Sequence, residues 1–165
     1  MAQGQIQFRS VHQVVRTLRI ITIALIGGIA VFSGASLFVQ PEQMNEGLRW
    51  PLIGTAAGLT VISVVASFVV VQSVLRSLLE KMAGASLHDR LQRVLSARII
   101  ALAVIEGPGL LWVITSMLFG EPVWLGGAAF SILLLAAQFP NEQQFEEWLG
   151  GTVEELDAQL TNHNE

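Results

Sequence analysis

Residues 99–119 read IIALAVIEGPGLLWVITSMLF, an apolar stretch that contains a single carboxylate, Glu106. A helix needs about 20 consecutive apolar residues to cross a bilayer, and this stretch has that length. A carboxylate near the centre of such a span costs roughly 2.5–3.5 kcal/mol on insertion. The stretch therefore predicts a membrane-spanning helix in which Glu106 has either a functional or a structural role.

The rest of the chain has the composition of a small polytopic membrane protein. Of its 165 residues, 52% are hydrophobic and only 13% are charged, whereas about one quarter of a soluble domain is charged. Three more apolar segments cover residues 18–39, 52–75 and 123–139. They are too long and too continuous for barrel strands. We therefore expect an all-α fold, a four-transmembrane-helix bundle over residues 1–140 with a cytoplasmic tail over residues 141–165.

One alternative concerns the first apolar segment. Arg16 and Arg19 precede its apolar core, and Ser33-Gly34-Ala35 resembles a small-residue cleavage site, as in a signal peptide. The apolar run continues to Val39, which is longer than a usual signal-peptide core and favours a retained helix.

The charges predict the orientation of the bundle. The basic residues gather in the amino-terminal arm and in the connection over residues 76–98, whereas the other two connections carry little positive charge. Loops rich in Arg and Lys stay on the cytoplasmic side. Both termini and the central connection are therefore expected in the cytoplasm, in a bacterial cell membrane.

Two amphipathic segments are expected on the cytoplasmic side. Ser86 and Asp89 resemble a capping box, which predicts a helix that starts near Leu87 and runs into the third span; a solvated connector is the alternative. After Pro140 the tail is acidic and amphipathic, with a break at Gly150 and a second capping box at residues 152–155. An acidic helix is repelled by anionic lipid, so we expect the tail to dock on the basic connection or on a partner.

The two halves of the chain show a weak internal repeat. Residues 19–28 and 98–107 are identical at six of ten positions at an offset of 79, and residues 53–57 echo residues 125–129. Chance matches are common in apolar sequence, so duplication of a helical hairpin and coincidence both stay open. In this alignment Gly27 is the counterpart of Glu106.

Glycines mark the expected helix contacts. Small residues let membrane helices approach closely, and we expect this role for Gly27 and Gly28 in the first span and for Gly54 and Gly58 in the second. Packing within one bundle is the simpler interpretation, and self-association through the Gly54/Gly58 face is the alternative.

Glu106 is followed by Gly107, Pro108 and Gly109. Proline has no N–H and its ring opposes the carbonyl four residues back, so these three residues predict a helix break and a free Val104 carbonyl. Ser63 and Ser67 lie at similar depth and are the expected hydrogen-bond partners of Glu106. The group could bind a proton or cation; the alternative is a protonated Glu106 that only fixes the bundle.

Two resemblances appear at these residues. The run ALAVIEGPGLLWVI resembles the carboxylate helix of the rotary-ATPase proteolipid (subunit c), in which the Glu carries a translocated proton. Over most of its length the chain more closely resembles small uncharacterised bacterial four-helix membrane proteins with an A-L-x-E-G-P motif, matched at Ala101 to Pro108, and an acidic helix after a proline, matched at Pro140 to Leu149. The second resemblance implies fold and membrane location only.

The sequence leaves two classes of function. The first is a non-enzymatic subunit or scaffold of a membrane assembly, a homo-oligomer or a complex with other membrane proteins in the lipid bilayer. The second is a proton- or cation-handling bundle that uses Glu106. The chain has no Cys and only three scattered His, so we expect no enzyme activity, metal or cofactor. It also lacks the basic, aromatic-rich face that nucleic acid requires.

Overall fold

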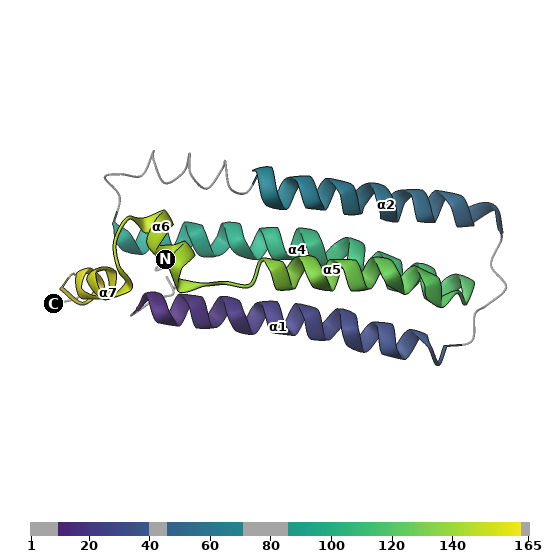
Figure 1. The fold of residues 1–165 in the computed structure, drawn as a ribbon, viewed down its shortest axis with the longest axis horizontal. Helices are drawn as coiled ribbons and strands as arrows, with labels where there is room; N and C mark the ends of the chain where they lie inside the picture. The colour runs from purple at the N-terminus through teal and green to yellow at the C-terminus, as the bar shows by residue number, and fades with distance from the viewer. Residues whose placement is uncertain (1–9, 40–45, 71–85, 163–165) are drawn as a thin grey trace, which may run out of the picture.

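The computed structural model describes residues 10–39, 46–70 and 86–162, and every regular element within these ranges is helical. Four long helices lie side by side, and two short ones cover one end of the bundle (Figure 1). The elements are α1 (Val11–Ser36), η1 (Glu46–Leu48), α2 (Arg49–Val65), the π-helical turn η2 (Ala66–Val70), α4 (Leu87–Phe119), η3 (Pro122–Trp124), α5 (Leu125–Ala137), α6 (Glu142–Leu149) and α7 (Val153–Asn162).

Three segments are long and apolar enough to cross a membrane: α1, the stretch Glu46–Val69 and α4. A fourth qualifies when Pro122–Ala137 is joined to Glu142–Leu149 across a bend of 59°. The predicted all-helical fold is therefore confirmed for the described residues, and three to four segments have the length and apolar composition that a multi-pass membrane protein needs. The predicted second span extends to Leu75, and its last residues lie outside the described part of the chain.

The predicted cytoplasmic helix forms and is continuous with the third span. The Ser86 hydroxyl accepts a hydrogen bond from the Asp89 backbone N–H at 3.2 Å and donates one to the Asp89 carboxylate at 2.8 Å. This cap starts α4 at Leu87, and the helix then runs for 33 residues. The tail also follows its predicted boundaries, because Gly150 ends α6 with a φ of 75° and the Thr152–Glu155 box precedes α7.

α4 is the central helix of the fold. It packs against α1, α2 and α5, whereas α2 has extensive contact with α4 alone among the long helices. The repeat predicts two equivalent hairpins, α1 with α2 and α4 with α5. The second pair packs together, whereas α1 and α2 lie on opposite sides of α4 and α5 (Figure 1). The packing therefore gives no support to a duplicated hairpin.

Two separate apolar cores hold the described residues together. One lies within the bundle, between α1, α4 and α5, and includes Ile29, Leu102, Ile105 and Leu135. The other lies at the end of the bundle where α1 begins, and it joins α1 and α4 to the two tail helices through Val11, Val14, Val15, Leu18, Leu91, Val94, Leu95, Phe145, Leu149, Leu156 and Leu160. The tail is therefore a folded cap with its own core.

Candidate functional site

Glu106 lies in the middle of α4 and is half-buried. Neither of its expected partners reaches it: the Ser63 hydroxyl bonds the carbonyls of Leu59 and Val104, and the Ser67 hydroxyl donates to the Val64 carbonyl at 3.1 Å. Within the described ranges no hydrogen bond or ion pair to the Glu106 carboxylate is formed. The expected Glu106–Ser63–Ser67 cluster is therefore not assembled.

Ser63 instead binds the backbone carbonyl that Pro108 leaves free. Its hydroxyl lies 2.8 Å from the Val104 oxygen, across the contact between α2 and α4. An unsatisfied carbonyl in a membrane costs several kcal/mol, so a hydroxyl on the neighbouring helix stabilises this position. The Val104 carbonyl does need a partner, as predicted. Ser63, which is expected from the sequence to bond Glu106, bonds this carbonyl instead.

The sequence predicts a helix break at Gly107, Pro108 and Gly109, and the secondary structure is not interrupted there; a bend of the helix axis at these residues stays a prediction. α4 continues through all three as one α-helix. Two contacts explain the continuity. Ser63 satisfies the orphaned carbonyl, and Gly109 is wedged against neighbouring helices, because a Cβ built on it would lie 2.9 Å from Ile29 Cδ1 and from Ser131 Cβ. Neighbouring helices thus hold the proline turn in helical geometry.

The four glycines predicted to make helix contacts face open space within the described part of the chain. A Cβ built on Gly27, Gly28, Gly54 or Gly58 would meet no described atom within 4 Å. Close packing falls instead on Gly109 and on Gly127 of α5, whose built Cβ would lie 2.4 Å from the ring of Trp112. Small residues occur on several faces of these apolar helices, so their presence alone does not identify the contact face.

Trp112 connects three elements. Its indole N–H donates to the Thr60 hydroxyl of α2 at 3.0 Å, and its ring stacks on Trp124 with centroids 5.9 Å apart. The same ring covers Gly127. Trp112 therefore fixes the rotation of α4 relative to both α2 and α5. This role of Trp112 could not be predicted, because a lone tryptophan in an apolar run carries no signal of its partners.

At the end of the bundle away from the tail, an ion pair joins the start of α2 to the connection between α4 and α5. Arg49 reaches both carboxylate oxygens of Glu121, at 2.6 and 2.8 Å, and Trp124 donates its indole N–H to the same carboxylate at 2.9 Å. Ser116 binds the Glu121 backbone carbonyl. The one arginine of the first connection and the one charged residue of the last connection, a glutamate on the same side of the predicted membrane, were the available signal for this pair.

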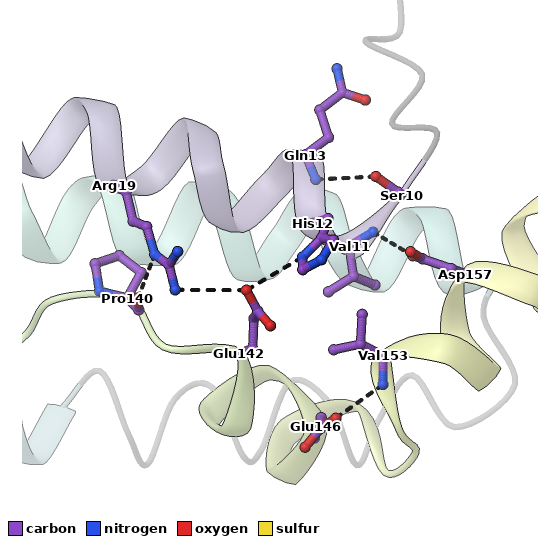
Figure 2. Close-up of polar contacts among 10 residues, drawn as sticks. All are labelled: Ser10, Val11, His12, Gln13, Arg19, Pro140, Glu142, Glu146, Val153 and Asp157. Carbon is purple, nitrogen blue, oxygen red and sulfur yellow. Dashed lines mark hydrogen bonds and ion pairs between the residues drawn. The ribbon is translucent and has the colours of Figure 1, made fainter.

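The tail is held by polar contacts to α1, as Figure 2 shows. Arg19 donates to the Pro140 carbonyl at 3.2 Å and lies 3.7 Å from the Glu142 carboxylate, which also lies 3.3 Å from His12. Asp157 of α7 accepts the first backbone N–H of α1, that of Val11, at 2.6 Å. The acidic groups of the tail thus cap and neutralise the start of α1.

The tail also contacts the start of α4. Arg98 donates to the Gln144 side chain at 2.9 Å and lies 4.3 Å above the ring of Trp148, and Arg90 donates to the Leu149 carbonyl at 3.3 Å. The prediction that the acidic tail docks on the basic connection is therefore confirmed for its described residues, 86–98.

In the described part of the chain, no group of three or more His, Asp or Glu side chains is arranged to hold a metal ion. Most serine, threonine and tryptophan side chains of the bundle bond another helix or their own backbone, whereas Glu106, the Ser33 hydroxyl and the Gln138 amide have no hydrogen-bond partner among the described residues. Comparisons with protein-family models, with curated proteins and with solved structures give no match.

Proposed function

We propose that the chain is a non-enzymatic subunit or scaffold of a membrane assembly, inserted with both termini and the tail cap in the cytoplasm. The observation that carries the proposal is the outward face of α2. This helix packs extensively on α4 alone among the long helices, and its Gly54 and Gly58 open onto space in which a built Cβ meets no described atom.

Such a face suits contact with another membrane helix. Lipid tails supply no hydrophobic drive between helices, so close backbone approach at small residues provides the association energy. Gly54 and Gly58 are spaced by four residues and thus share one face of α2. Large apolar side chains flank them, including Val61 and Ile62, which are 63% and 62% exposed. The neighbour is a second copy of this chain or a different membrane subunit.

The orientation rests on charge. Five arginines lie near the amino-terminal ends of α1 and α4, at the end of the bundle that carries α6 and α7 (Figure 1). They are Arg16, Arg19, Arg90, Arg93 and Arg98. By the positive-inside rule, this gathering of arginines supports a cytoplasmic location for that end.

The mass of the assembly in native membranes tests the proposal. We expect the protein, extracted in mild detergent and measured by native mass spectrometry, to exceed its chain mass of 17.9 kDa. Gly58→Leu should release the monomer, because a Cβ at this position meets no described atom within 4 Å and the larger side chain is expected to cover the open α2 face. Gly126→Leu is the matched control, since its Cβ also meets nothing within 4 Å. A monomer in wild type, unchanged by Gly58→Leu, would rule out the scaffold.

A second function, proton or cation handling, is favoured by one observation. Glu106 is a half-buried carboxylate in an apolar helix and has no hydrogen-bond or ion-pair partner among the described residues. A structural carboxyl group in a membrane is expected to be bonded to a neighbouring helix, and this one is not. The Glu106 carboxylate can therefore bind a proton, a cation or a group on another subunit.

Two substitutions of Glu106 separate these functions. Glu106→Gln keeps size and hydrogen bonding but removes the titratable proton, whereas Glu106→Leu removes both. If Glu106 handles ions, Gln should assemble normally and abolish ion flux in proteoliposomes and reaction with carbodiimide. If Glu106 only contacts a neighbour, Gln should behave as wild type and Leu should alter the assembly mass. Absence of flux in wild type would end the ion-handling hypothesis.

A further inference from the structure

A groove of about 470 Å³ lies beside the first turns of α1 and is closed on one side by the start of α6. Its lining includes His12, Gln13, Arg16 and Arg19 of α1 together with Glu142. Figure 2 shows four of these side chains, with Glu142 between His12 and Arg19. The groove takes no part in the α2 face or in the surroundings of Glu106.

The groove stands at the level where lipid headgroups would lie. His12, Arg16, Arg19 and Ile23 follow one another at spacings of four, three and four residues, so they form one stripe along α1. Ile20, beside this stripe, and Ile23 are each 59% exposed, as expected of side chains that face lipid. The same side of α1 thus changes from lipid-facing apolar residues to basic residues within about one turn.

The groove carries a net positive charge, and its exposed cation is Arg16. The Glu142 carboxylate is shared by Arg19, at 3.7 Å, and His12, at 3.3 Å, and Arg19 also donates to the Pro140 carbonyl. Arg16 is exposed and forms no ion pair with a described residue. Glu142 therefore fixes Arg19 in the groove wall without neutralising Arg16.

We propose that this groove binds the phosphate of an anionic phospholipid, with Arg16 as its principal cation and Arg19 as a flanking donor. The planar guanidinium group matches phosphate oxygens with two parallel hydrogen bonds. Acyl chains of a lipid held there would run along Ile20 and Ile23. Basic residues next to a span attract the anionic cytoplasmic leaflet. A bound lipid would link the tail cap to the membrane surface through Glu142 and Pro140.

The test uses the full chain in vesicles of phosphatidylcholine with and without phosphatidylglycerol, followed by native mass spectrometry of retained lipid. We expect wild type to retain phosphatidylglycerol in preference to phosphatidylcholine. Arg16→Gln should lower the apparent affinity about fivefold, the effect of one interfacial cation. Arg93→Gln is the matched control, because Arg93 is exposed on α4 outside the groove and the change in net charge is the same.

Three results would overturn the proposal. The first is equal retention in wild type and Arg16→Gln. The second is an equal loss in Arg93→Gln, which would show general surface attraction. The third is displacement of phosphatidylglycerol by excess inorganic phosphate at matched ionic strength, which would identify a site for soluble phosphate. Should Arg16→Gln fail to fold, the wild-type preference for phosphatidylglycerol and its resistance to inorganic phosphate decide the matter.

Discussion

Gly127→Ala is expected to destabilise the bundle by about 1–3 kcal/mol, the usual cost of overpacking a well-packed interior. The new methyl carbon would lie 2.4 Å from Cγ and Cδ2 of Trp112, so the ring must move. The ring is held on two other sides, by its hydrogen bond to Thr60 and by its stack on Trp124. The substitution therefore weakens the contacts of α4 with both α2 and α5. Unfolding in mixed micelles, followed by tryptophan fluorescence, measures the loss.

The adjacent glycine provides the control. Gly126 lies in the same turn of α5, and a Cβ there meets nothing within 4 Å. Gly126→Ala should be neutral or stabilising by up to about 1 kcal/mol, because alanine in a helix loses less backbone entropy than glycine. Equal effects of the two substitutions would show that Trp112 does not hold the helices in the described way.

Local features of the fold could be predicted from the sequence. The starts of α4 and α7 follow from hydroxyl and carboxylate side chains three residues apart, and the end of α6 follows from Gly150. Each signal acts within one turn of the chain, so no knowledge of the tertiary structure is needed. The docking of the tail was also predictable, because an acidic amphipathic helix and a basic connection were expected on the same side of the membrane.

Contacts between the membrane helices could not be predicted in the same way. A span that is apolar on all sides gives no periodic signal for its contact face. The sequence therefore predicts contacts at Gly27 and Gly54, where the structure is open. It gives no signal for the tight contact at Gly127. The Val104 carbonyl was correctly identified as needing a partner, but the depth and rotation of α2 decide that Ser63 provides it.

Phe145→Ala is expected to release the tail cap while leaving the membrane bundle folded. Phe145 is completely buried at the centre of the apolar core formed by α1, α4, α6 and α7, and its ring lies 5.4 Å from that of Trp148. Replacing a buried phenylalanine by alanine costs about 3–5 kcal/mol. Helices α6 and α7 have only 8 and 10 residues, and isolated helices shorter than about 12–15 residues are marginal in water.

The two tail helices therefore depend on docking, and loss of this anchor should unfold them together. Hydrogen exchange of the purified protein in nanodiscs should show amide protection lost across α6 and α7 but retained in the apolar stretches of α1, α4 and α5, whose core is separate. Glu147→Ala, at an exposed position of α6, should leave protection unchanged. Retained tail protection in Phe145→Ala would mean that the polar contacts of Arg19, Arg98 and Asp157 hold the cap without its apolar core. Loss of protection in the bundle as well would mean that cap and bundle fold as one cooperative unit.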